Sequence, residues 1–199
     1  MLRKLNIYER LNKIIHKIED ETFIKGRGLG NEISFYVFDY DPKDELIVRE
    51  HIEYIKKYFS RPTSERKIIE FDLYKMMLDI ANEKGILDKI FDLEQKKGKE
   101  FLYNAMTNFA QPSIFLDKIK NEVEGYNVVF LTGIGKVYPF VRSHTILNNL
   151  QEVLDKIPVI LFYPGKYTGQ SLELFGKFKD ENYYRAFQLV DEKGDIHEA

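Results

Sequence analysis

The sequence predicts an α/β fold, in which a mostly parallel sheet carries helices on both faces and a helical insertion interrupts the chain at about 75–124. The prediction depends on three kinds of segment in the sequence: amphipathic helical stretches, short apolar runs and the turns between them. Segments with helical spacing of apolar residues alternate with short apolar runs, and turn residues separate the two. The apolar runs, typical of buried strands, are 33–38, 67–73, 126–131 and 158–163. Such alternation indicates a three-layer architecture like a degenerate nucleotide-binding fold.

The N-terminal third is predicted to form a helix, a loop, a strand and a second helix. Three glycines predict a loop over 23–31, and the first strand follows it. Asp41 and Pro42 then supply a cap and a first helical residue. Each of the two helices has its apolar residues on one stripe. These stripes are Leu2, Leu5, Leu11, Ile15 and Ile18 in the first helix, and Val48, Ile52, Ile55 and Phe59 in the second.

The rest of the chain is predicted to supply the insertion, two strands and a C-terminal extension. Pro139 is predicted to open a helix between the third and fourth strands. Residues 172–190 are predicted to add one or two short strands, and 191–199 a flexible charged tail. A length of 199 residues fits a single domain over 1–199. Helices of the insertion are predicted at 76–83, 86–93, 101–109 and 113–124.

Composition excludes several classes of protein. The chain contains no cysteine, which excludes a disulfide scaffold and a cysteine nucleophile and favours a cytoplasmic location. Charges interrupt the apolar residues of the N-terminus, so neither a signal peptide nor a membrane-spanning helix is predicted. A formal net charge of −2 offers no general attraction for polyanions. Direct DNA contact is therefore predicted to be weak or absent.

Polar residues follow the predicted strands, and parallel strands would bring them together at one edge of the sheet. Two interpretations remain open. The residues form a site for a phosphate, a metal-bound ligand or a partner, or they are strand-to-helix turns, which need a capping acid and a glycine. The residue types favour turns. The set contains Asp39, Asp41, Asp72, Gly133, Gly135, Lys136, Gly165 and Lys166.

The nucleotide-binding motifs are incomplete at this edge. A P-loop needs a glycine five residues before the glycine of its Gly-Lys pair and a Ser or Thr after the lysine. Phe130 and Val137 occupy those two positions around Gly135 and Lys136. A dinucleotide fingerprint would need a third glycine where Tyr138 stands. No cofactor is therefore predicted.

The histidines and Arg142 do not complete a catalytic set either. His144 shares a helical face with Phe140 and Leu147, which favours a core histidine over a catalytic one. Arg142 has two interpretations, an anion-binding residue at the sheet edge or a structural ion pair, and the second is favoured. The remaining histidines have no companions at metal-ligand spacing. Neither a catalytic residue nor a metal site is predicted.

Aromatic and basic residues interleave over 163–187. This pattern is typical of a surface that stacks on bases, of a protein interface, or of core aromatics with solvated lysines. Tyr167, Tyr183 and Tyr184 combine apolar area with a hydroxyl group, which suits an interface. We predict these three residues as an interface, with at least one of them partly exposed.

Three long strings resemble the BrxB family of bacterial BREX phage-defence systems. They are GLGNEISFYVFDYDPKDE at 28–45, VVFLTGIGKVYPFVRSHTILNNL at 128–150 and PVILFYPGKYTGQSLELFGKFKDENYYRAFQLV at 158–190. The resemblance implies a small accessory member of an assembly that restricts phage DNA and marks host DNA. Such assemblies combine a DNA methyltransferase, a large ATPase and an alkaline-phosphatase-like protein called PglZ. The resemblance carries no catalytic residue over to this chain.

Two hypotheses follow. The first is a non-catalytic adaptor that binds other BREX proteins, above all PglZ, through the sheet edge and the aromatic C-terminal third. The second is a nucleotide- or metal-dependent enzyme, or a nucleic-acid-binding component, that uses Asp39, Asp41, Asp72, Lys136 and Arg142. A broad exposed aromatic patch favours the first, and convergent carboxylates around a deep pocket favour the second.

Overall fold

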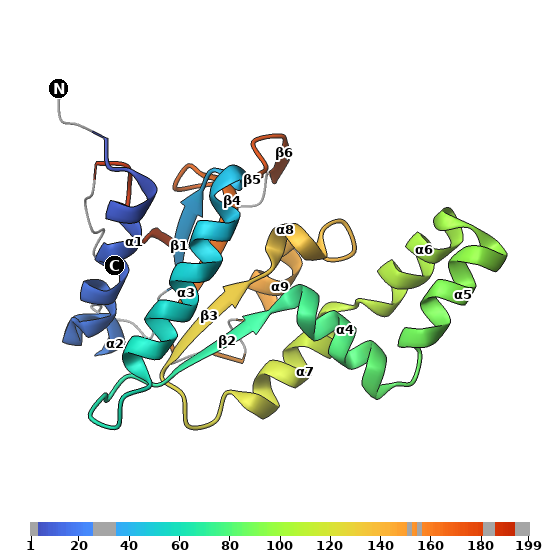
Figure 1. Ribbon diagram of the computed structural model, residues 1–199, viewed down its shortest axis with the longest axis horizontal. Coiled ribbons are helices and arrows are strands. Elements are labelled where there is room, and N and C mark those ends of the chain that lie inside the picture. The colour runs from blue at the N-terminus through green and yellow to red at the C-terminus, as the bar shows by residue number, and fades with distance from the viewer. Residues whose placement is uncertain (1–3, 26–34, 151–152, 155–156, 181–185, 194–199) are drawn as a thin grey trace.

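The computed structural model describes residues 4–25, 35–150, 153–154, 157–180 and 186–193 (Figure 1). Its helices are α1 (Ile7–Glu19), α2 (Glu21–Lys25), η1 (Pro42–Asp44, a 3-10 helix), α3 (Glu45–Phe59), α4 (Leu73–Glu83), α5 (Leu87–Lys97), α6 (Lys99–Phe109), α7 (Pro112–Glu122), α8 (Ile134–Val137) and α9 (Ser143–Leu150). Its strands are β1 (Phe35–Tyr40), β2 (Ile68–Asp72), β3 (Val128–Thr132), β4 (Val159–Tyr167), β5 (Leu172–Leu174), β6 (Phe178–Asp180) and β7 (Phe187–Gln188).

The sheet has the strand order β2-β3-β4-β1-β7, and each neighbouring pair is parallel. In the central pair, the register runs from Phe35 opposite Val159 to Tyr40 opposite Pro164. The carboxyl end of β4 continues into an antiparallel extension formed with β5 and β6. This topology confirms the predicted α/β fold with a mostly parallel sheet.

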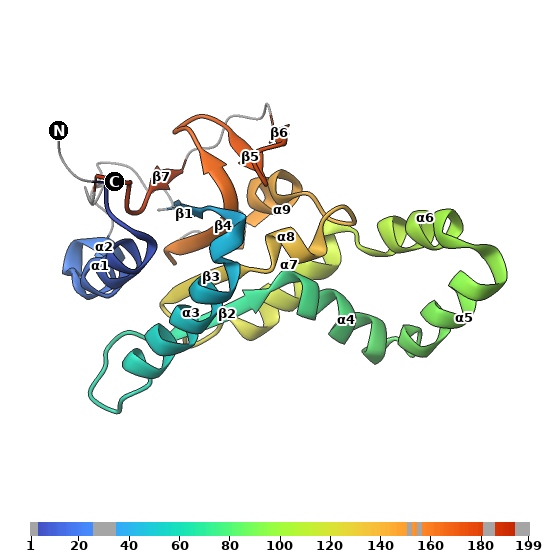
Figure 2. The same cartoon turned by 45° about the horizontal axis from the view of Figure 1, so that its top comes forward.

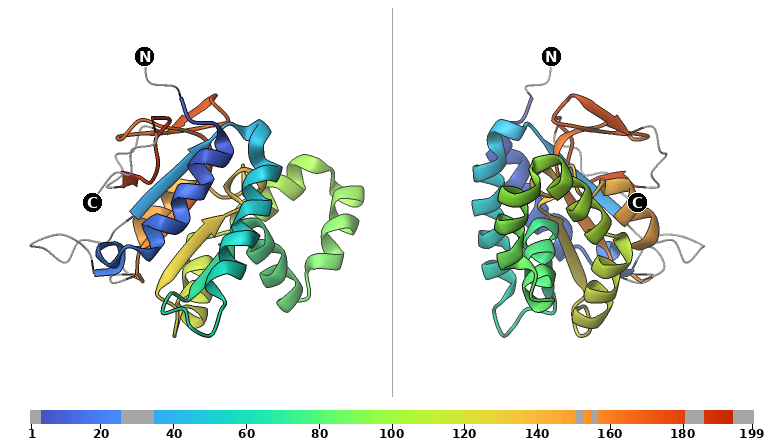
Figure 3. Two further views of the ribbon diagram at one scale, coloured as in Figure 1. Left: turned by 60° about the vertical axis from the view of Figure 1, so that its left-hand side comes forward. Right: turned by 90° about the vertical axis from the view of Figure 1, so that its right-hand side faces the viewer.

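The two faces of the sheet pack against different helices. Successive strand residues point to opposite faces. On one face Leu131 and Leu161 join a core formed with α4, α6, α7, α8 and α9. On the other, Phe130 and Phe162 have ring centroids 5.1 Å apart and join a core formed with α1, α2 and α3. Figure 3 shows the blue α1 and cyan α3 lying together over the sheet. The predicted cover of helices on both faces is therefore confirmed.

Four helices, α4 to α7, occupy the predicted insertion between β2 and β3. Met76 of α4 and Phe115 of α7 are buried against the sheet. By contrast, α5 has no buried residue and α6 has one, Met106. Figures 1 and 2 show α5 and α6 as a hairpin that projects from the rest of the molecule.

Two predictions for the N-terminal region need correction. The first helix begins at Ile7, because the side chain of Asn6 accepts a hydrogen bond from the Glu9 backbone and the Glu9 side chain accepts one from the Asn6 backbone. Phe23, predicted in a loop, lies in α2 and is buried. The glycines of that loop, and Leu2, fall outside the described residues.

Two predictions for the C-terminal half are also wrong. Pro139 follows a cis peptide bond and opens no helix, and α9 begins only at Ser143. The fourth strand was predicted to end at Tyr163, but β4 extends to Tyr167 because β5 pairs with its last residues. Of the predicted tail, the structure describes 191–193, where the Glu192 carbonyl accepts a hydrogen bond from the Leu5 backbone, 2.8 Å. Within the described part of the chain, no helix is both long and apolar enough to cross a membrane.

Candidate functional site

Asp39, predicted at the sheet edge, ties four elements of the fold together. Only 13% of its side chain is exposed. One carboxylate oxygen accepts hydrogen bonds from Arg10, 2.9 Å, and Gln188, 3.2 Å, and the other accepts one from the Tyr167 backbone, 3.1 Å. Arg10 is itself buried and also donates to the Val190 carbonyl, 2.7 Å. These contacts, which we call the Asp39 node, join α1, β1, β4 and β7.

Asp41 lies in an exposed turn. Its side chain caps the 3-10 helix by accepting a hydrogen bond from the Lys43 backbone, 3.0 Å, and it pairs with the Lys43 ammonium group, 2.8 Å. The hydrogen bond from the Lys43 side chain lowers the pKa of the Asp41 carboxyl group. The geometry is that of a helix start, as the turn interpretation predicts.

Asp72, Gly133 and Lys136 do come together at the ends of β2 and β3. Asp72 caps α4 by accepting hydrogen bonds from the backbones of Tyr74 and Lys75, and it forms an ion pair with Lys136. Gly133 has a φ of +75°, and a Cβ atom at this position would lie 2.1 Å from Asp72 Oδ1. Gly133 is thus needed both for its backbone conformation and for the space that the cap occupies.

Gly135 and Gly165 allow the β5 hairpin to pack closely. A Cβ atom on Gly135 would lie 2.9 Å from the ring of Phe175, and one on Gly165 would lie 2.1 Å from the carbonyl oxygen of Glu173. Gly165 and the exposed Lys166 therefore belong to the extended β4 rather than to a loop after it.

Arg142 is exposed, and its side chain forms no hydrogen bond or ion pair with the residues that the structure describes. The structural ion pair favoured for this residue is thus absent from the described part of the chain. The side chain of His144 lies outside the described residues, so its predicted place in the core is not addressed.

Tyr167 belongs to the core and not to a surface. It is 3% exposed, and its hydroxyl group donates a hydrogen bond to the Ala186 carbonyl, 2.6 Å. The interface prediction is wrong for this residue, because the extension of β4 carries it between the sheet and the C-terminal segment. Tyr183 and Tyr184, the other predicted interface residues, lie outside the described residues.

Sequence reasoning missed a groove of about 720 Å³ beside β2, between α3 on one side and α4 and α7 on the other. Glu70 of β2 lies in it and accepts hydrogen bonds from Thr132, 2.7 Å, and Lys56, 2.5 Å. Lys56 also pairs with Glu53, 2.6 Å. Burial opposes the charge on Lys56, but the hydrogen bonds from Lys56 to both glutamates outweigh it and raise the pKa of the ammonium group. The position of Glu70 two residues before Asp72 was the available signal, because both side chains project from the same face of a strand.

The groove is polar, and five of its seven carboxylates are held by groups of the chain itself. At its other end, burial and the neighbouring carboxylate of Glu45 raise the pKa of the Tyr40 hydroxyl group, which donates to Glu45, 2.6 Å. Among the described residues, no group of three or more His, Asp or Glu side chains is placed to hold a metal ion.

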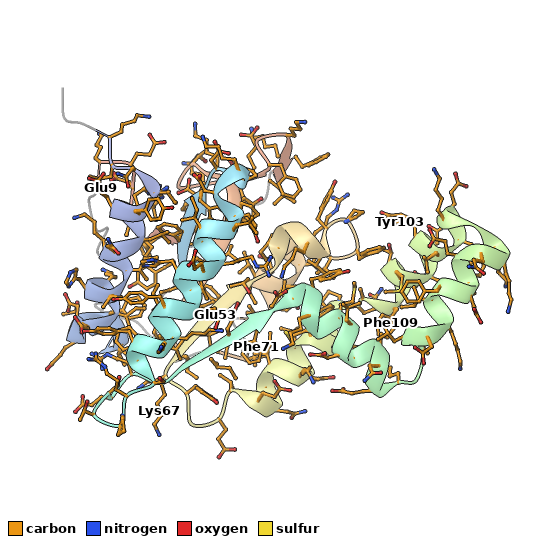
Figure 4. All side chains as sticks on the ribbon, viewed as in Figure 1. Glu9, Glu53, Lys67, Phe71, Tyr103 and Phe109 are labelled. Carbon is orange, nitrogen blue, oxygen red and sulfur yellow. The ribbon has the colours of Figure 1, made fainter. Side chains whose placement is uncertain are left out.

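A second missed feature is a set of four aromatic side chains in two contacting pairs, which we call the aromatic ridge. It consists of Tyr103 on α6, Tyr138 and Phe140 in the turn after α8, and Phe178 on β6. Ring centroids are 6.0 Å apart for Tyr103 and Phe140, and 5.0 Å apart for Tyr138 and Phe178. Tyr103 is 43% and Phe178 48% exposed, and Figure 4 shows Tyr103 on the side of α6 that faces the body of the molecule. The exposed Arg142 follows this turn.

The chain is similar to known BREX proteins. A family model described as "BREX protein BrxB" matches residues 69–189. A BREX protein BrxB from Bacillus cereus is 50% identical over 194 residues, which cover 96% of this chain and 100% of that protein. Another from Escherichia coli is 34% identical over 187 residues, which cover 93% of this chain and 92% of that protein. No solved structure matches the chain.

Proposed function

This chain belongs to the BrxB family of BREX proteins, and we propose that it serves its phage-defence system as a non-catalytic adaptor that holds other BREX proteins together. Its principal partner in this proposal is the alkaline-phosphatase-like component PglZ. The adaptor binds through exposed side chains and takes no part in bond breaking.

The aromatic ridge is the observation that carries the proposal. Aromatic side chains bury a large area while losing few rotamers, and tyrosine adds a hydroxyl group that forms hydrogen bonds at a wet interface. The turn after α8 carries one ring of each pair, so a partner that covers this turn can also contact the insertion helix α6 and the C-terminal hairpin. In each pair an exposed ring, Tyr103 or Phe178, packs on a half-buried ring of the turn, and aromatic side chains are enriched among interface hot spots.

The sheet-edge residues support the same proposal. The competing enzyme hypothesis uses Asp39, Asp41, Asp72, Lys136 and Arg142, and the side chains of all but Arg142 are engaged in contacts within the chain. A catalytic role would require a ligand to break those contacts. The adaptor role leaves them intact.

Capture of partners from the native host tests the proposal. Tagged full-length chain is expected to retain PglZ and other BREX proteins, and the double variant Tyr103→Ala with Phe178→Ala is expected to lose them. Tyr126→Ala is the matched control, since Tyr126 is 40% exposed but lies before β3, away from the ridge. If the natural sequence, the double variant and Tyr126→Ala capture BREX proteins equally, an adaptor that acts through the ridge is contradicted.

Enzymatic activity provides a separate test. The purified chain is expected to hydrolyse neither nucleotides nor phosphodiesters. Robust hydrolysis that is lost in Asp72→Asn, with the fold intact, would overturn the proposal in favour of the enzyme hypothesis.

A further inference from the structure

A second surface, apart from the aromatic ridge, is the free edge of β2. β2 is the terminal strand in the sheet order, and β3 is its one neighbour among the described strands. An edge strand leaves part of its backbone unpaired. Lys67 directs its backbone toward β3, since its N–H donates to the Asn127 side chain, 2.8 Å, and its carbonyl accepts from the Asn127 backbone, 3.0 Å. Because the direction alternates along a strand, Ile68 and Glu70 present their N–H and carbonyl groups to the open edge.

The groove lies along this edge and has the dimensions of an extended peptide. Its walls come from α3, which contributes Glu50 and Glu53, and from α4 and α7. Glu53 of α3 and Phe71 of β2, both labelled in Figure 4, belong to this lining. The five residues of β2 span roughly 17 Å at about 3.3 Å per residue, the length of a short added strand. A volume of about 720 Å³ leaves room for the side chains of such a segment.

The charges of the groove select the occupant. Its lining contains seven carboxylates and five cations, a net of two negative charges. Lys56, Lys118 and Lys136 are already paired with carboxylates of the chain. Four exposed side chains of the lining form no hydrogen bond or ion pair with any described residue, namely Glu50, Asp79, Arg49 and Lys75, so the net negative charge belongs to the lining as a whole. Two copies joined at this edge would bring like charges together, whereas a basic segment would be attracted.

We propose that the edge of β2 binds an extended segment of a partner protein as an added strand, and that lysine or arginine side chains of this segment face Glu50 and Asp79. Backbone hydrogen bonds to Ile68 and Glu70 supply affinity, and the charged walls supply specificity. The inference rests on the proposed adaptor function. It adds a second binding surface to the aromatic ridge, and an adaptor needs two.

Hydrogen exchange tests this proposal on the full chain, alone and in the complex captured with BREX proteins. The amide groups of Ile68 and Glu70 are expected to exchange rapidly in the free protein and at least about tenfold more slowly in the complex. A complex that forms with no added protection at these amides would overturn the strand proposal while leaving the adaptor function in place. Failure to capture any BREX protein would overturn both.

A proline substitution tests the same edge by affinity. Proline is tolerated at the first residue of a strand, and Ile68→Pro removes one outward N–H from that position of β2. The variant is expected to bind the captured partner about tenfold more weakly, whereas Ile68→Val, which keeps the N–H, stays within about twofold. Equal affinity of the two variants would overturn the proposal. Should Ile68→Pro fail to fold, the exchange measurement on the natural sequence decides.

The identity of the bound segment is tested by measuring how protection depends on the partner and on the concentration of the chain. Partner-dependent protection at Ile68 and Glu70 supports a segment of another protein. Protection that rises with the concentration of the isolated chain, together with a dimer in analytical ultracentrifugation, would overturn the partner segment in favour of a second copy.

Discussion

The Asp39 node and the aromatic ridge are opposite in character. The node gathers charged side chains that suit catalysis, yet they lie inside the fold and bind one another. The ridge gathers rings that suit a core, yet two of them are more than 40% exposed. Residue type alone therefore does not separate structural from functional residues. What separates them is whether the folded chain already satisfies the side chain.

The largest expected effect comes from breaking the node. Asp39→Ala leaves Arg10 buried without its carboxylate, and we expect the free energy of unfolding to fall by about 3–5 kcal/mol, as for other buried pairs that lose one partner. Urea unfolding measures this change. Asp41→Ala, at an exposed capping carboxylate two residues away, is the control and should cost only about 1 kcal/mol, that of a lost cap. Similar midpoints for both variants would show that the node does not hold the fold.

A smaller effect is expected where the chain turns after β3. Gly133→Ala places a Cβ atom at a positive φ and against the Asp72 side chain. We therefore expect the free energy of unfolding to fall by about 2–3 kcal/mol. Gly125→Ala is the matched control, because Gly125 has a φ of +84° but nothing within 4 Å of an added Cβ atom. Its cost should be about 1 kcal/mol, that of the backbone conformation alone. Equal losses in thermal unfolding would contradict the close approach of Asp72 to Gly133.

The smallest expected effect depends on pH. Desolvation lowers the pKa of His51, which packs beneath α1 and hydrogen-bonds to the Leu11 backbone. Below about pH 6.5 the unfolded chain therefore binds a proton more readily than the folded protein does. The free energy of unfolding should decline as the pH falls from 7 toward 5, and less steeply in His51→Gln. Identical slopes in the two proteins would rule out a contribution from His51.

Much of the fold was predictable because its signals are local. Apolar runs placed the first four strands within two residues at every end except the carboxyl end of β4, and the Asp41-Pro42 cap marked the helix that follows β1. Errors arose where distant pairing decides the structure. The last residues of β4 are in a strand because β5 returns beside them, and no feature of 164–167 alone indicates this.

The candidate site was harder to predict for the same reason. Sequence spacing brought Asp72, Gly133 and Lys136 correctly to one edge, because parallel strands align their ends. It did not reveal that Asp39 meets Arg10 and Gln188, or that Tyr103 meets Phe140, because these contacts join segments from different parts of the chain. Whether a polar residue is free for a ligand depends on such contacts.

Binding of a BREX partner to the ridge is measured by the affinity of purified PglZ for the natural sequence, Tyr103→Ala and Tyr126→Ala. Tyr103→Ala should weaken binding by about 2 kcal/mol, roughly thirtyfold, while its free energy of unfolding changes by no more than about 0.5 kcal/mol. The natural sequence and Tyr126→Ala should bind equally. Unchanged affinity of Tyr103→Ala, or parallel losses of affinity and stability, would contradict the account.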